Sequence, residues 1–218
     1  MTRKLIPFLV AGALLATVPG VAPVQAAPQA ASEVRVASPS KLVLDNSQRI
    51  LSTLESRRAE FTKNPSALRQ FVIGEFNTMF DRDYAARQVL GRHGRGASDA
   101  DIKAFGDALA DNLMQRYGTS LLSFNTKLRV RVKSETPLPR GLGVKVSSEM
   151  LRSDGDAIPV DYLMRMSGGQ WKVFDVMVEG VSFVQTFRQQ FDQELQNKSI
   201  AQVAAELRNG QLQADADK

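Results

Sequence analysis

The first part of the chain has apolar residues at helical spacing. This spacing begins at Ser38 and is interrupted at Asn64-Pro65, where a proline suited to a first helical turn predicts a second helix. A short helix is predicted over 84–90, and Ser98-x-x-Asp101 resembles a capping box that opens the clearest helix. The apolar stripes of the three longer helices are Val43, Ile50, Leu54 and Phe61; Leu68, Phe71, Val72, Phe76, Met79 and Phe80; and Ile102, Phe105, Leu109, Leu113 and Tyr117.

After Phe124 the period of the pattern changes to two. Apolar and polar residues alternate over 128–133, 144–150, 158–166 and 171–179, with short turns between these segments. Four consecutive strands joined by short turns favour an antiparallel meander. One face of this sheet is apolar, and the other carries Lys, Arg, Asp and Glu.

Two more helices are predicted after the strands, at Ser182-x-x-Gln185 and Ser199-x-x-Gln202. Because helices precede and follow the sheet, they must cover its apolar face. We therefore predict an α+β fold: a curved four-stranded antiparallel sheet wrapped by helices from both ends of the chain, cone-like with an apolar interior. The single domain covers 38–209, and the polar residues 210–218 are expected to be a disordered tail.

The first 26 residues have the pattern of a secretory signal peptide. Arg3 and Lys4 precede an apolar run, and Val24-Gln25-Ala26 provides the small side chains that predict cleavage after Ala26. An uncleaved anchor is the weaker interpretation, because the apolar run falls short of the roughly 20 residues that span a membrane. Residues 27–37 lack periodicity and are predicted to be a flexible leader.

Composition restricts the chemistry that the chain could perform. Its 218 residues include no cysteine and one histidine, His93, which excludes disulfides, thiolate nucleophiles and sulfur-based zinc sites. An exported chain without cysteine is more typical of a bacterial envelope than of animal secretion. The formal charge of +5 comes without a dense Lys/Arg block, so nucleic acid is not expected as a partner.

Candidate catalytic motifs are weak. The glycine-rich segment 91–96 follows a helix and lacks the lysine of a phosphate-binding loop, so a basic connection between helices is the better interpretation. Asp161, Asp175 and Glu179 could perform acid–base chemistry, but a salt-bridged sheet face is favoured. There is no Gly-x-Ser-x-Gly nucleophile motif. We expect no enzymatic activity, no catalytic residue and no metal site.

The methionines add an ambiguous signal. Met150, Met164, Met166 and Met177 lie in the strand half, where β-branched and aromatic residues are more usual. Methionine suits a wall that adapts to a variable ligand, but it also fills gaps in ordinary cores. Composition therefore leaves both a hollow, ligand-binding interior and a packed core open.

Two segments resemble the signature of a known family. WKVFDVMVEGVSFVQTFRQQF, residues 171–191, and FDRDYAARQVLGRH, which follows Met79, are similar to the MlaC family, the periplasmic phospholipid-binding component of the Mla lipid-transport pathway, also called the toluene-tolerance auxiliary component. Gly94 stands where the family has a tryptophan. The resemblance spans roughly residues 40 to 208. Trp171, Asp175, Glu179, Gly180, Ser182, Arg188 and Phe191 stand on family positions.

The resemblance implies a carrier in the periplasm of a Gram-negative bacterium. Such proteins move phospholipid between an outer-membrane lipoprotein–porin complex and an inner-membrane ABC lipid transporter complex, with the acyl tails inside the protein and the headgroup outside. It implies phospholipid as cargo, no cofactor and no catalytic residue, and we expect a monomer.

Strand parity and the helix stripes together give a candidate lining for the tails. The basic residues Arg92, Arg95 and the stripe 127–133 are candidates for contact with a headgroup or a membrane. A periplasmic lipoprotein carrier or chaperone remains an alternative, as does an enzyme on a cone-shaped fold of the nuclear-transport-factor-2 type. The candidate lining is Val130, Val132, Val144, Val146, Met150, Val160, Tyr162 and Met164 on the sheet, and Phe76, Phe80, Phe105 and Leu109 on the helices.

Overall fold

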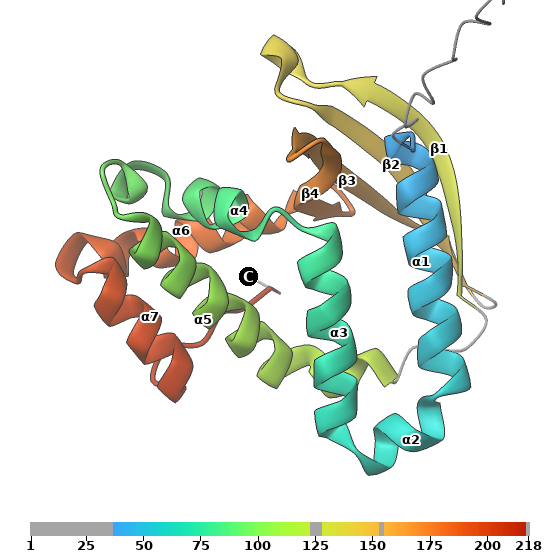
Figure 1. Ribbon diagram of the computed structural model, residues 1–218, viewed down its shortest axis with the longest axis horizontal. Coiled ribbons are helices and arrows are strands. Elements are labelled where there is room, and N and C mark those ends of the chain that lie inside the picture. Colours follow the sequence, from blue (N-terminus) through green and yellow to red (C-terminus); the bar gives the residue numbers. More distant parts are fainter. Residues whose placement is uncertain (1–36, 123–127, 153–154, 217–218) are drawn as a thin grey trace, which may run out of the picture. The chain divides into compact units, whose positions relative to one another are not determined.

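An antiparallel sheet and two groups of helices make up the computed structural model, which describes residues 37–122, 128–152 and 155–216 (Figure 1). The predicted signal peptide, 1–26, and all but the last residue of the predicted leader, 27–37, lie outside the described residues. The helices are α1 (Pro39–Ser56), α2 (Arg58–Lys63), α3 (Pro65–Met79), α4 (Arg82–Leu90), α5 (Asp99–Tyr117), α6 (Phe183–Asn197) and α7 (Ile200–Asn209). Among the described helices, none is long and apolar enough to cross a membrane.

The helix starts predicted at Ser38, Asn64-Pro65, Ser98, Ser182 and Ser199 are confirmed by their caps, whereas the helix predicted over 84–90 begins earlier, after Asp81. At each of them a side-chain oxygen accepts a hydrogen bond from the backbone N–H three residues later, which satisfies one of the free donors of the first turn. At Ser199 the side chain of Gln202 returns the bond to the cap backbone, which completes a capping box. The capping residues are Ser38, Asn64, Asp81, Ser98, Ser182 and Ser199.

The sheet has one strand more than predicted. Residues Glu179 and Gly180 both have positive φ, at 51° and 84°, and form a two-residue turn that returns the chain alongside β4. The sheet is open, with β1 and β5 at its edges in the order β1-β2-β3-β4-β5, so the predicted cone is not closed. The strands are β1 (Arg129–Pro137), β2 (Val144–Leu151), β3 (Ile158–Ser167), β4 (Gln170–Val178) and β5 (Val181–Ser182).

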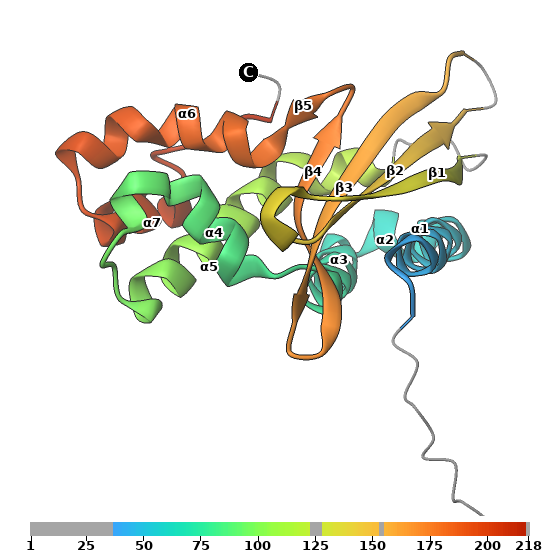
Figure 2. The same ribbon diagram turned by 90° about the horizontal axis from the view of Figure 1, so that it is seen from above.

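Helix α1 covers the apolar face of the sheet. Val43 of α1 packs against Val146, Met164 and Val173, and all four side chains are almost completely buried. Both ribbon views place α1 beside β1 and β2 (Figures 1 and 2). The other face carries ion pairs instead, as predicted from its charged residues, for example between Lys145 and Asp161.

The remaining helices build a second core away from α1. Helices α4, α5, α6 and α7 pack together on one side of the sheet (Figure 2). Phe105 of α5 meets Phe191 of α6 edge to face, with ring centroids 5.6 Å apart, and both are fully buried. Leu207 of α7 is equally buried in this cluster.

The prediction that the chain end is disordered is wrong for residues 210–216. The amide of Asn112, buried in α5, donates to the backbone oxygens of Leu207 and Leu212 at 2.8 and 3.0 Å. Its oxygen accepts from the backbone N–H of Ala214, which is completely buried. One polar side chain therefore satisfies three backbone groups of the chain end, which polarity alone does not reveal.

We expect Asn112→Ala to lower the free energy of unfolding by about 2–4 kcal/mol, because three backbone groups of the chain end would lose their partner. Urea unfolding measures the difference. Asn197→Ala is the matched control, since Asn197 is exposed and bonds within its own helix. Equal small effects of the two substitutions would show that the chain end is not packed on α5.

Candidate functional site

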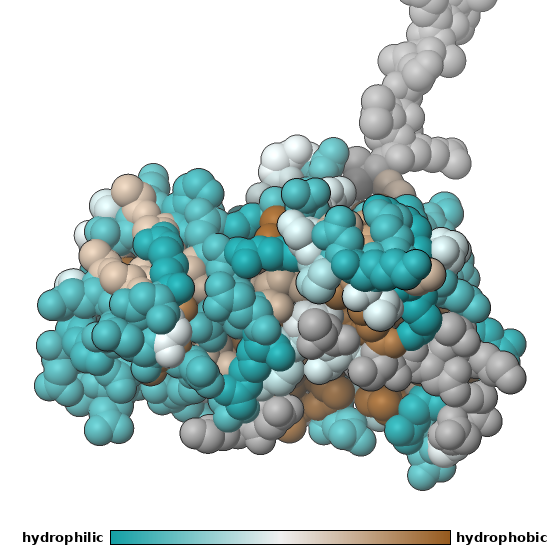
Figure 3. All heavy atoms as spheres, turned by 90° about the horizontal axis from the view of Figure 1, so that it is seen from below, coloured by the Kyte–Doolittle hydropathy of each residue, from teal (hydrophilic) through white to brown (hydrophobic). Residues whose placement is uncertain are grey.

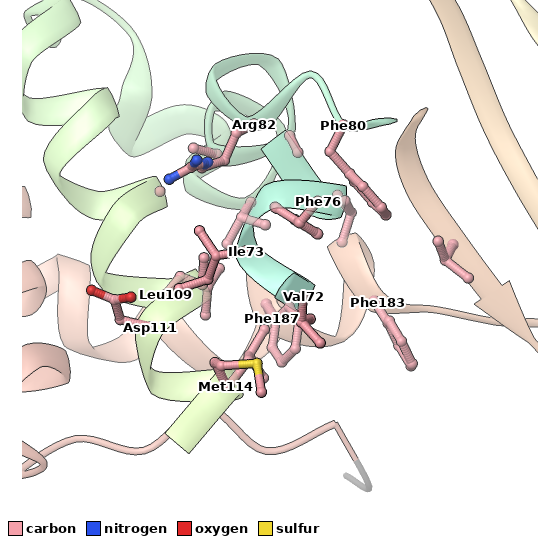
Figure 4. A pocket seen from close by; sticks show the side chains of 18 of the residues that line it. Val72, Ile73, Phe76, Phe80, Arg82, Leu109, Asp111, Met114, Phe183 and Phe187 are labelled. Atoms are coloured by element: carbon pink, nitrogen blue, oxygen red, sulfur yellow. The ribbon is translucent and has the colours of Figure 1, made fainter. Parts of the chain in front are cut away.

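A cavity of about 400 Å³ lies between α3, α4, α5, α6 and β4 (Figure 4). Its walls are almost entirely apolar. Such a volume, with few polar groups, is typical of a pocket for an apolar small molecule. The lining residues are Val72, Ile73, Phe76, Asn77, Phe80, Arg82, Ala85, Ala86, Val89, Gly106, Leu109, Ala110, Asp111, Leu113, Met114, Tyr117, Gly118, Leu121, Phe174, Asp175, Val176, Phe183, Val184 and Phe187.

Helix α3 contributes a wall that is packed mainly near its start. It buries a single residue, Leu68, although its apolar stripe is wide. Val72 and Phe76 of that stripe and the neighbouring Ile73 face the cavity (Figure 4), and the ring of Phe76 stacks on that of Phe80 with centroids 4.0 Å apart. Near its start this stripe packs against Leu54 and Phe61, whereas Phe76 and Phe80 border the cavity.

The sheet reaches the cavity through an irregularity in β4. The pairing of β3 with β4 shifts between Leu163 and Met164, which leaves Phe174 without a cross-strand partner. Phe174 lines the cavity and meets the ring of Tyr84 edge to face, at 5.2 Å between centroids. A strict alternation along the strand would not have selected this residue.

Asp175 is a buried carboxylate that lines the cavity, and 7% of its surface is exposed. It accepts hydrogen bonds from the Ser182 hydroxyl at 2.5 Å and from the Val184 N–H at 3.0 Å, so it joins β4 to the start of α6. Burial raises the pKa of Asp175, while these two hydrogen bonds act in the opposite direction. Because both oxygens are engaged, the arrangement favours a structural role over acid–base chemistry.

Charged residues gather where the cavity meets solvent, between α3 and α5. Arg82 bonds to Asp107 and to the Asn77 side chain, and Arg69 forms an ion pair with Asp111 at 2.8 Å. The Asp111 side chain is 40% exposed, and the Arg82 side chain 24%. Elsewhere on the surface, apolar side chains are visible near the middle of one face, framed by polar ones (Figure 3).

Three of the twelve residues of the predicted lining border this cavity: Phe76, Phe80 and Leu109. Phe105 does not, because it is packed against Phe191.

None of the eight strand residues of the predicted lining borders the cavity either. The alternation along the strands assigns these residues correctly to the apolar face of the sheet, but α1 covers that face. Val146, Val160 and Met164 are buried in the sheet core, Val132, Val144 and Tyr162 pack beside it, and Val130 pairs with Met150. Contact of these strand residues with a ligand stays a prediction.

Four of the other candidate residues lie in ion pairs: Arg92, His93, Arg131 and Lys133. The ring of His93 contacts Asp192 at 2.9 Å, and Arg92 contacts the same carboxylate at 3.0 Å. On the outer face of the sheet, Arg131 and Lys133 both bond to Glu149. Lys127 lies outside the described residues. In the described ranges, no group of three His, Asp or Glu side chains could hold a metal ion.

Several lining residues belong to the apolar stripes of the helices and could have been identified from them. The prediction relied instead mainly on the alternating residues of the strands. Val72, Leu113 and Tyr117 belong to the helical stripes, which are wider than one packed core requires. Val184 and Phe187 continue the same pattern on α6. Excess apolar width on several helices was therefore the better indicator of a cavity.

We expect Ile73→Trp to change the free energy of unfolding by less than about 1 kcal/mol, because the added ring can enter the cavity. Ile102→Trp is the matched control: Ile102 is fully buried on α5 and does not border the cavity, so overpacking should cost about 1–3 kcal/mol. Urea unfolding of both variants tests this. Equal losses would show that α3 is packed as tightly as α5.

The raised pKa of Asp175 also has a measurable consequence. The folded protein favours the protonated carboxyl, so its contribution to stability is lost as the pH rises from the ordinary aspartate value of 3.8 through the raised pKa. Asp175→Asn does not titrate, so its free energy of unfolding relative to wild type should increase over that range. Urea unfolding at several pH values measures the difference, and a constant or decreasing difference would contradict the expectation.

Three known proteins are similar to this chain over most of its length. Toluene tolerance protein ttg2D of Pseudomonas putida is 26% identical over 191 residues, which cover 84% of this chain and 87% of that protein. The intermembrane phospholipid transport system binding protein MlaC of Haemophilus influenzae is 22% identical over 151 residues, covering 68% and 70%. A phospholipid-binding protein from Ralstonia solanacearum, solved in complex with a phospholipid, matches with a TM-score of 0.70 and 20% identity, over 80% of this chain and 98% of that one.

The family signature is also matched directly. Residues 44–209, well over half of the chain, fit the family described as MlaC protein. This range contains both segments on which the resemblance was based, around Met79 and over 171–191. The chain therefore belongs to the MlaC protein family.

Proposed function

We propose that this protein is a periplasmic phospholipid carrier that holds acyl chains in the cavity between α3, α5, α6 and β4. The observation that carries the proposal is the cavity itself: about 400 Å³ with apolar walls, in a chain of the MlaC family. The names of the Haemophilus influenzae and Ralstonia solanacearum proteins support phospholipid as the cargo. Exchange with an outer-membrane lipoprotein–porin complex and an inner-membrane ABC lipid transporter complex is part of the proposal.

Transfer requires direct contact with a membrane or a partner. Two acyl tails contain about 30 methylenes, each worth roughly 0.8 kcal/mol when removed from water. The sum of about 24 kcal/mol exceeds the strongest noncovalent affinities, near 18–21 kcal/mol. Release into water would therefore be too slow to serve transport, and the tails must pass directly into another apolar environment.

The cavity must also widen to hold two tails. Two tails occupy roughly 800 Å³, near the upper end of ligand pockets and about twice the volume present. The middle of α3 is the part of the wall suited to shift, because only Leu68 of this helix is buried while both of its ends are fastened to other elements. A smaller volume without cargo is expected, since an empty cavity destabilises a protein in proportion to its size.

A carrier fits the site better than the two alternatives. An enzyme on a cone-shaped fold would need titratable groups exposed inside, whereas Asp175 has both oxygens engaged and Arg82 and Asp111 lie in ion pairs at the rim. A lipoprotein carrier would also use an apolar cavity. The identity of the bound lipid distinguishes this alternative from the proposal.

We expect protein isolated from a Gram-negative periplasm to carry close to one diacyl phospholipid per chain, measured by native mass spectrometry and lipid extraction. Ile73→Trp should lower this loading several-fold because it occupies cavity space. Val181→Trp is the control, since Val181 is exposed and does not line the cavity. Folded wild-type protein without phospholipid, or with a lipidated peptide in its place, would overturn the proposal.

A further inference from the structure

The rim of the cavity between α3 and α5 holds a set of charges that the apolar interior does not explain. Asp107 and Asp111 are one helical turn apart on α5, so they project from the same side of the helix. Each is paired with an arginine from another element: Asp107 with Arg82 at the start of α4, and Asp111 with Arg69 of α3. Two guanidinium groups are thereby held against neighbouring carboxylates of α5.

This rim has an excess of positive charge. Lys103 also pairs with Asp107, at 3.1 Å, so the ion pairs join three cations to two carboxylates. Arg82 and Asp111 themselves line the cavity, on the side away from the phenylalanine rings (Figure 4). A ligand with apolar chains inside the cavity and an anionic group at its edge would meet these guanidiniums with that group.

From this arrangement we infer that Arg69 and Arg82 bind the phosphate of the cargo, an inference that rests on the proposed function. Guanidinium groups suit phosphate because their N–H donors match two oxygens of the anion at once. Asp107 and Asp111 hold both arginines in place when the cavity is empty and compete with the phosphate for them. The rim thus selects lipids that carry a phosphate over neutral lipids with the same chains.

The test compares two lipids that differ only in the headgroup. The full chain is incubated with vesicles of dioleoylphosphatidylglycerol containing dioleoylglycerol, and the bound lipids are extracted and quantified by mass spectrometry. Arg69→Gln with Arg82→Gln should lower the bound ratio of phospholipid to diacylglycerol about tenfold, because charge-assisted hydrogen bonds to the phosphate are lost. Asp107→Asn with Asp111→Asn should raise the ratio, since the phosphate then no longer competes with two carboxylates for the arginines.

The opposite signs separate phosphate binding from a purely structural role. If the ion pairs only fasten α3 and α4 to α5, removing either partner changes loading in the same direction, and the inference is overturned. Arg131→Gln with Lys133→Gln is the matched control, because it also removes two positive charges, but from the outer face of the sheet. An equal fall of the ratio in this control would attribute the effect to net charge and would also overturn the inference.

Two further results keep the inference distinct from the proposed function. Wild-type protein that loads neither lipid refutes the carrier, whereas loading of both with a ratio unchanged in the variants refutes the phosphate site alone. Excess inorganic phosphate should leave the wild-type ratio unchanged, because the tails retain the headgroup at the rim. If the wild-type ratio equals that of the arginine variant while only the wild type binds inorganic phosphate, the arginines bind a free anion and not the anion of the lipid.

Discussion

A cavity with apolar walls persists only where its walls are held apart by contacts made elsewhere. In this protein the wall concerned is α3, and it is held at its ends. After its last turn, Phe80 forms a backbone bridge with Val173, and the N–H of Asp81 donates to the oxygen of Val173 at 2.8 Å. Arg165 bonds to Asp81 and lies over the ring of Tyr84, 4.3 Å from its centroid. These contacts fix the α3–α4 junction to the sheet.

The beginning of α3 is held by a different cluster. Leu68 packs with Leu54 of α1 and Phe61 of α2, and all three are buried. Between the two ends, Val72, Ile73 and Phe76 face the cavity. The three buried clusters of the described residues, centred on the sheet, the α1–α2–α3 corner and the α4–α7 helices, therefore meet around a space that none of them fills. The function proposed for the molecule depends on that unfilled junction.

Much of the fold was predictable because it depends on local sequence. Helix starts follow from caps such as Ser38 and Ser98, and strand positions follow from alternation. The site was less predictable because it depends on contacts between distant segments. Parity assigned Val146 and Met164 correctly to the apolar face, but it could not show that Val43 closes that face. The bulge that brings Phe174 into the cavity lies outside any regular period.

The packing of the chain end on α5 has a consequence for biosynthesis. The bonds from Asn112 reach Leu207, Leu212 and Ala214, and Arg188 of α6 donates to the backbone oxygen of Gln88, 100 residues earlier. Contacts at such sequence separation form late, after the costs of closing long loops have been met. The α4–α7 core therefore closes only once the segment up to Ala214 is available to pack on α5. Folding of these helices is completed by the part of the described chain that is synthesised last.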